Sequence, residues 1–159
     1  REKGVRVSAV CPAGVETEVF AFGKLPLAFS ARCFTARHYD LNKDDCQFKC
    51  LDHAEGLTLK TRDGQDFLCI NGIQTMSAQS YSLLHEIPDL LAMGIDIVRI
   101  SPQQQHVGEI IAAFDAARRG EEVGTDGSGW NASGLVDGYW FGDAGIRQHH
   151  TQTREQLGA

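Results

Sequence analysis

Three of the five cysteines are spaced like a set of metal ligands. Cys33, Cys46 and Cys50 form a C-x12-C-x3-C array. The segment between them is polar and turn-prone, so the thiols could converge on one centre whose binding energy orders the chain. Thiolates select zinc, copper(I) or iron–sulfur centres over magnesium or calcium. On spacing alone, such a site and three unrelated reduced thiols are equally good interpretations.

The spacing leaves the identity of the centre open. Zinc takes four ligands, and His38 or His53 would complete a Cys3His set. An iron–sulfur cluster takes a fourth cysteine, which we expect upstream of Arg1. The remaining two cysteines, Cys69 in an apolar run and Cys11 before Pro12, are interpreted as structural thiols that behave as small hydrophobes.

Charged and aromatic side chains elsewhere suggest weaker hypotheses. Arg32 and Arg37 flank Cys33, where they could stabilise an anionic cluster, hold an anionic ligand, or pair with Asp40 or Asp44. The pair His149-His150 is predicted to lie in a solvated polar tail that spans residues 141–159. Tyr139 and Trp140 are expected to pack the segment before that tail.

Composition limits the class of protein. The chain has 159 residues, a net charge of −6 and a pI near 5.4. This length predicts about one domain, and the acidic balance argues against a nucleic-acid partner. No apolar run is long enough to span a membrane. An odd, sparse set of cysteines favours a reducing compartment, and the cytoplasm is the expected location.

The elements that would position these residues alternate between strands and helices, which predicts an α/β fold. Helices are expected at Tyr81–Met93, interrupted by Pro88, and at Val107–Arg119. A loop or short helix is expected from Lys24 to Cys33. Strands are expected at Val5–Val10, Glu16–Phe22, Thr58–Thr61, Phe67–Ile70 and Ile95–Ile100, with a hairpin turn at Asp63-Gly64.

Four strings resemble a known family in the same order along the chain. They are LPLAFSARCFTAR at 25–37, NGIQTMS at 71–77, DIVRISPQ at 96–103 and GYW at 138–140. Together they resemble the collagenase-like (U-type) peptidase family, and within it the branch of accessory proteins for ubiquinone biosynthesis. The likeness covers about residues 15–140 and corresponds to the C-terminal half of a member. Asp137 stands where many relatives carry Asn, and its role stays open.

The resemblance implies more than the spacing does. It implies that residues 1–140 are the C-terminal part of a barrel-like β/α fold with a cysteine-bearing insertion. It implies a 4Fe–4S cluster held by Cys33, Cys46, Cys50 and a fourth cysteine upstream. It also implies oxygen-independent hydroxylation of a quinone precursor, which a lipid-binding protein would present, and a homologous partner subunit. The run Phe22, Leu25, Leu27 and Phe29 would contact either that partner or the rest of the same chain.

Two alternatives remain beside this hypothesis. Other branches of the family resemble RNA-hydroxylating enzymes, although the acidic composition argues against RNA. A zinc-binding or interaction module without catalysis is the second alternative. Peptidase activity is not supported, because the sequence shows neither a Ser/His/Asp order nor an HExxH motif.

Overall fold

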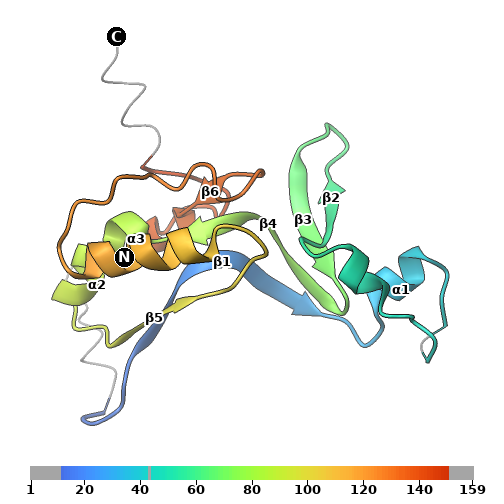
Figure 1. The fold of residues 1–159 in the computed structure, drawn as a ribbon, viewed down its shortest axis with the longest axis horizontal. Coiled ribbons are helices and arrows are strands. Elements are labelled where there is room, and N and C mark those ends of the chain that lie inside the picture. Colours follow the sequence, from blue (N-terminus) through green and yellow to red (C-terminus); the bar gives the residue numbers. More distant parts are fainter. Residues whose placement is uncertain (1–11, 43, 151–159) are drawn as a thin grey trace. The chain divides into compact units, whose positions relative to one another are not determined.

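The computed structural model describes residues 12–42 and 44–150 (Figure 1). The predicted strand Val5–Val10 and Cys11 lie outside these residues. Within them, strands and helices alternate, as the sequence predicts. The α-helices and 3-10 helices are α1 (Phe34–His38), η2 (Lys49–Asp52), η3 (Leu84–Glu86), α2 (Ile87–Ala92), α3 (Val107–Arg118) and η4 (Gly138–Phe141). The strands are β1 (Glu18–Phe29), β2 (Leu57–Lys60), β3 (Asp66–Asn71), β4 (Gln74–Ser82), β5 (Ile97–Ile100) and β6 (Leu135–Val136).

The strands form one mixed sheet in the order β2-β3-β4-β1-β5, with β6 paired to β4. β1 and β5 are parallel, whereas β2, β3 and β4 pair as antiparallel neighbours. The predicted α/β class is therefore confirmed. Over the described residues the sheet is open, with β2 and β5 as its ends, so these strands do not close the expected barrel.

The chain divides into two units. Residues Lys24–Ser80 form one, which we call the cysteine unit because it holds Cys33, Cys46, Cys50 and Cys69. The remaining described residues, 12–23 and 81–150, form the other, which we call the α/β unit. β1 and β4 each contribute residues to both units.

Strand β1 is longer than the sequence predicts, and the loop or short helix expected from Lys24 is wrong. The strand continues through Gly23 and Pro26 to Phe29. Pro26 lacks an N–H, which normally excludes proline from a central strand. β5 pairs with β1 only from Glu18 to Phe22. Pro26 therefore falls where β5 no longer pairs with β1, and the strand tolerates it.

The helix expected at Tyr81–Met93 begins later than predicted. Tyr81 is the penultimate residue of β4, and the Leu83 N–H donates to the Ala21 carbonyl at 2.8 Å. Pro88 lies in the first turn of α2, where its missing N–H costs nothing. Pro88 therefore marks the start of this helix and does not interrupt a longer one.

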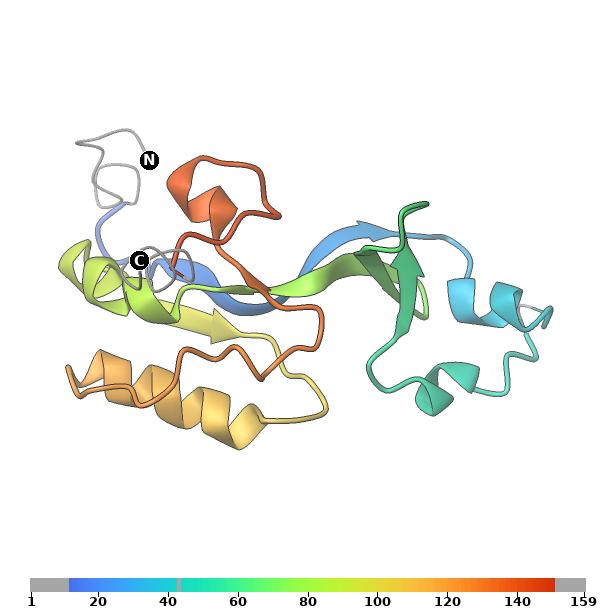
Figure 2. The ribbon, with the colours of Figure 1, turned by 90° about the horizontal axis from the view of Figure 1, so that it is seen from above.

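Three local predictions are confirmed. The Asp63-Gly64 turn joins β2 and β3 as an antiparallel hairpin. A strand occupies Ile97–Ile100, and α3 spans Val107–Arg118 beside it (Figure 2). The apolar face of α3 is buried through Ile110, Ala113, Phe114 and Ala117.

An aromatic cluster forms the core of the α/β unit. Phe22 is fully buried, with ring centroids 6.0 Å from Phe114 and 5.6 Å from Trp130, both in edge-to-face geometry. Edge-to-face contacts stabilise aromatic pairs beyond the area they bury. Phe22 therefore belongs to the core, and only the later members of its apolar run, Leu27 and Phe29, are exposed.

Gly56 is expected to tolerate no side chain. Its φ is +81°, and a Cβ there would lie 2.5 Å from the Cys69 sulfur. Gly56→Ala should lower the free energy of unfolding by about 2–5 kcal/mol, from backbone strain plus steric overlap. Gly64 is a matched control, because its φ is +86° with no atom within 4 Å. Gly64→Ala should lower the free energy of unfolding by only about 1–2 kcal/mol, as measured by denaturant titration. Equal losses in the two variants would contradict the close packing on Cys69.

Candidate functional site

Cys33 begins the short helix α1 in the cysteine unit. Its sulfur accepts a hydrogen bond from the Ala36 N–H at 3.4 Å, so it occupies the N-cap position. The turn between β3 and β4 holds this helix in place. The Phe34 N–H donates to the Gly72 carbonyl at 2.8 Å, and the Gly72 N–H donates to the Thr35 hydroxyl at 3.1 Å. The two residues that follow Cys33 are therefore held against the turn between β3 and β4.

Cys46 and Cys50 bracket a strained segment. Gln47 and Phe48 both have φ of +50°, in the left-handed region that non-glycine residues rarely adopt. Each such conformation lowers the stability of the folded state by on the order of 1–3 kcal/mol. It persists where the surrounding structure imposes it, often at functional sites. The side chain of Phe48 is 70% exposed, so burial of its ring does not offset the strain.

The elements carrying Cys33 and Cys50 contact each other. α1 packs against η2, which contains Cys50. The Tyr39 hydroxyl lies 2.5 Å from His53 Nε2, and their rings stack with centroids 5.7 Å apart. His53, one of the two histidines considered as a zinc ligand, is therefore engaged with Tyr39. The other, His38, packs edge-to-face on the same Tyr39 ring.

The three cysteines fit a thiolate-bound centre in their chemistry. Cys33, Cys46 and Cys50 are free thiols, each only partly exposed, and all lie in the cysteine unit. Across residues 12–42 and 44–150, no three His, Cys, Asp or Glu side chains are grouped closely enough to hold a metal ion. Ligation by these cysteines thus stays a prediction.

A small pocket adjoins Cys33. It is lined by Arg32, Cys33, Ala36, Arg37 and Leu41. Within the described part of the chain, neither arginine forms an ion pair, so the predicted alternative of pairing with Asp40 or Asp44 is not observed. The two guanidinium groups remain available to an anionic group beside Cys33.

Cys69 is a buried structural thiol, as predicted. Only 1% of it is exposed, and its S–H donates to the Glu55 carbonyl at 3.0 Å. The Lys24 ammonium lies 3.4 Å from the same sulfur and also donates to the Glu55 carbonyl at 2.9 Å. This hydrogen bond from Cys69 connects β3 to the turn that precedes β2.

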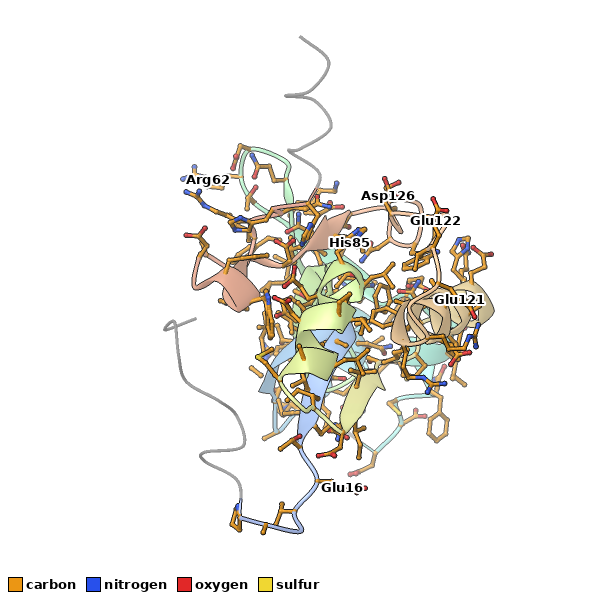
Figure 3. All side chains as sticks on the ribbon, turned by 90° about the vertical axis from the view of Figure 1, so that its left-hand side faces the viewer. Glu16, Arg62, His85, Glu121, Glu122 and Asp126 are labelled. Atoms are coloured by element: carbon orange, nitrogen blue, oxygen red, sulfur yellow. The ribbon has the colours of Figure 1, made fainter. Side chains whose placement is uncertain are left out.

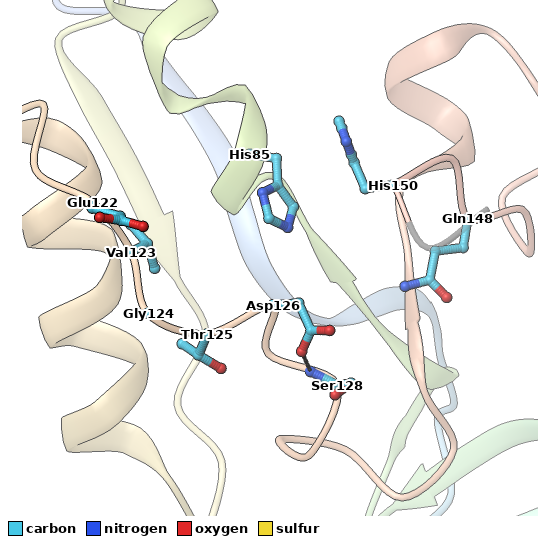
Figure 4. A pocket seen from close by; sticks show the side chains of 9 residues that line it. All are labelled: His85, Glu122, Val123, Gly124, Thr125, Asp126, Ser128, Gln148 and His150. Carbon is cyan, nitrogen blue, oxygen red and sulfur yellow. Dashed lines mark hydrogen bonds between the residues drawn. The ribbon is translucent and has the colours of Figure 1, made fainter. Parts of the chain in front are cut away.

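The α/β unit contains a second pocket, which the sequence did not predict. Its cavity volume is about 540 Å³. The loop after α3 supplies one wall, with the carboxylates of Glu122 and Asp126 (Figure 3). His85 from η3 and His150 lie opposite (Figure 4). The remaining lining residues are Val123, Gly124, Thr125, Ser128 and Gln148.

A buried carboxylate organises the histidine side of this pocket. Glu86 is 7% exposed, and both of its oxygens have partners. The indole N–H of Trp140 donates to Oε2 at 2.5 Å, and Nε2 of His150 lies 2.8 Å from Oε1. The ring of His150 also lies 4.8 Å from that of His85, centroid to centroid.

His149 and His150, predicted to lie in a solvated tail, contact preceding segments of the chain, although His150 is exposed. The His149 N–H donates to the buried Asp137 carboxylate at 2.8 Å, and His150 pairs with Glu86. The ring of Phe141 packs 4.3 Å from that of His149. His150 and Glu86 are 64 residues apart, so no local pattern in the sequence predicts their contact.

Tyr81 lies next to these carboxylates. Burial, and then the charges of Asp137 and Glu86, raise the pKa of Tyr81 from 10.0 to about 12. Burial and repulsion from negative charge both disfavour tyrosinate, so the causes act in the same direction.

This pKa predicts a loss of stability at alkaline pH. Between pH 10 and about 12 the unfolded chain releases the Tyr81 proton while the folded protein keeps it. The free energy of unfolding should therefore fall as pH rises through this range. Tyr81→Phe removes the ionisable hydroxyl and with it this pH dependence. In denaturant titrations, the free energy of unfolding of the variant minus that of the unmodified protein should therefore rise with pH. A difference that stays constant from pH 9 to pH 11 would contradict the assignment.

Comparison with known proteins places the chain in a family. Residues 6–120 match the model of peptidase family U32, so the chain belongs to that family. A similar curated protein is tRNA hydroxylation protein P1 of Bacillus subtilis (strain 168), at 25% identity over 112 residues. That alignment covers 66% of this chain and 26% of the relative, so the chain spans about a quarter of that protein. No solved structure matches the chain. Among the described residues, no helix is long and apolar enough to cross a membrane.

Proposed function

We propose that this chain belongs to an iron–sulfur subunit of an oxygen-independent hydroxylase. The C-x12-C-x3-C array inside the region that matches family U32 carries the proposal. Support comes from a relative that is named for hydroxylation. Cys33, Cys46 and Cys50 would be three ligands of a 4Fe–4S cluster, with a fourth cysteine outside this sequence.

Within this class, we propose a UbiV-type role in ubiquinone biosynthesis. The strings at 25–37, 71–77, 96–103 and 138–140 support it, since they resemble that branch in the same order. The substrate would be a quinone precursor, and the partner a homologous UbiU-like subunit in a heterodimer. The protein fold would be the barrel-like fold of the family, of which these strands form one part.

Hydroxylation of RNA is the second candidate, and one observation favours it. The relative at 25% identity is a tRNA hydroxylation protein. The net charge of −6 argues against a phosphate-binding face on this portion of the protein. The two candidates share a reaction class and differ in substrate.

The residues around Cys33 suggest how the site would work. A cluster bound there would supply electron transfer or substrate activation. The guanidinium groups of Arg32 and Arg37 would offset the negative charge of thiolate ligands and contact an anionic reactant that approaches Cys33. The pocket itself, at about 20 Å³, has room for little more than a water molecule. The N-cap position of Cys33 would fix one ligand while the Cys46–Cys50 segment supplies the others.

Deletion and complementation would separate the two candidates. The gene would be deleted, and cells grown without oxygen would be analysed for ubiquinone and for hydroxylated nucleosides in digested tRNA. The UbiV-type role predicts loss of ubiquinone, restored by the intact gene and not by a Cys33→Ala copy. Loss of a hydroxylated nucleoside with normal ubiquinone would instead establish the RNA-directed role.

A further inference from the structure

The pocket of the α/β unit holds a histidine–carboxylate pair suited to proton transfer. Glu86 is buried and accepts from Nε2 of His150 at 2.8 Å, which places the proton of a neutral imidazole on Nε2. Nδ1 is then the acceptor nitrogen, and it has no hydrogen-bond partner among the described residues. A base oriented by a carboxylate is the usual arrangement for general base catalysis.

Glu86 is itself fixed in position. The Trp140 indole donates to its second oxygen, so the carboxylate cannot rotate away from His150 without losing that hydrogen bond. Glu86 lies in η3, directly after His85, whose imidazole points into the space between Asp126 and His150 (Figure 4). One short helix therefore positions both the carboxylate and the second histidine.

The opposite wall is preorganised by close packing. The Ser128 N–H donates to Asp126 Oδ1 at 3.0 Å, and the Gly127 N–H donates to the Thr125 hydroxyl at 3.0 Å. Gly127 has a φ of +74°, and a Cβ there would lie 2.6 Å from the Trp130 ring. The loop therefore rests on the aromatic core at Gly127, and the Asp126 carboxylate is held by the Ser128 N–H (Figure 4).

The charges around the pocket restrict the ligand. Glu122 and Asp126 contribute carboxylates, and no lysine or arginine is among the described lining residues, so a ligand that already carries a negative charge in solution is disfavoured. An anion formed inside the pocket by proton transfer to His150 would instead be paired with the imidazolium. Partial burial, and then the His150 ring, lower the pKa of His85, while Asp126, Glu86 and Asp137 oppose this shift. The lower pKa favours neutral imidazole at His85, which would provide a hydrogen bond without a positive charge.

We propose that this pocket binds a small uncharged molecule with a weakly acidic hydroxyl group, and that His150, positioned by Glu86, accepts the hydroxyl proton. In this step the O–H bond of the ligand breaks, its electron pair stays on oxygen, and an N–H bond forms at Nδ1. The resulting imidazolium remains paired with Glu86. A cavity of about 540 Å³ is within the usual range for small-molecule sites. The proposal is independent of the cluster.

Binding of 4-nitrophenol to the full-length protein tests the site, because its anion absorbs visible light and its neutral form does not. The protein should bind it saturably and increase the absorbance of the anion at a pH below the pKa of the free phenol. His150→Gln should weaken binding about tenfold or more, the expected contribution of a charge-assisted hydrogen bond. His106→Gln is the matched control, since His106 pairs with Glu109 at 3.2 Å on an exposed surface outside the pocket. It should bind like the unmodified protein.

Glu86→Gln tests the positioning role separately. A glutamine can still accept from Trp140, but its amide N–H would face Nε2 of His150 and would favour the tautomer with its proton on Nδ1. Nitrogen NMR of labelled histidine should show an Nε2–H tautomer in the unmodified protein and an Nδ1–H tautomer in the variant. Because Nδ1 then carries a proton and cannot accept another, the variant should also lose the increase in 4-nitrophenol anion absorbance.

Two results would overturn the proposal. One is the absence of saturable 4-nitrophenol binding by the folded, unmodified protein. The other is binding by His150→Gln equal to that of His106→Gln. His150 is partly exposed, so its substitution is not expected to prevent folding. The comparison of His150→Gln with His106→Gln therefore tests the proposal even if Glu86→Gln, a change at a buried residue, disturbs the fold.

Discussion

Replacing Cys46 with alanine is expected to remove iron from the full-length protein and to abolish hydroxylation. Alanine provides no sulfur to bind iron, so a cluster with one ligand missing should not assemble or persist. Anaerobic purification followed by iron analysis and visible absorption spectra measures this directly. The expected result is near-complete loss of iron and of the thiolate-to-iron absorption. Cys33→Ala and Cys50→Ala should behave in the same way.

The matched controls are the two cysteines interpreted as structural. Cys69→Ser keeps a donor toward the Glu55 carbonyl and should retain iron, as should Cys11→Ser. Together the variants separate ligation from general damage to the fold. Full iron loading in Cys46→Ala would exclude that residue as a ligand, whatever the activity of the protein.

The second large effect is expected at Phe22. Phe22→Ala should reduce the free energy of unfolding by about 3–5 kcal/mol, because it leaves a cavity between Phe114 and Trp130. Phe29 lies on the same strand but is 72% exposed, so Phe29→Ala should change stability by less than about 0.5 kcal/mol. Denaturant titration of both variants measures the difference.

The same pair of variants bears on partnership. Phe22 packs inside the α/β unit, so its loss should weaken folding regardless of any partner. Phe29, with exposed Leu27, would contact a UbiU-like subunit or the rest of the protein. Co-purification with the candidate partner should therefore fall for Phe29→Ala while stability does not. Equal destabilisation by the two substitutions would show that Phe29 is buried in the full-length protein.

The sequence predicted the elements whose signals are local. The Asp63-Gly64 hairpin and helix α3 follow from turn chemistry and from apolar spacing within a few residues. The positions of Pro26 and Pro88 differ from what local pattern predicts, because the free-energy cost of a proline depends on its surroundings. Pro26 is tolerated where β5 does not pair with β1, and Pro88 because it lies in the first turn of α2.

The two candidate sites also differ in whether their residues are close together in the sequence. The cysteine array is local in sequence, and the structure places all three cysteines in one unit. The second pocket joins His85, Asp126 and His150 from three separate segments. No local pattern connects these positions, since they meet only because β4, α3 and the last described residues fold together.

The most direct test of the proposed function is the content of iron, acid-labile sulfide and zinc in the anaerobically purified full-length protein. A 4Fe–4S cluster predicts iron and sulfide in equal amounts, a brown colour, and little zinc. One zinc ion for each protein, with neither iron nor sulfide, would contradict it and would favour a structural zinc module.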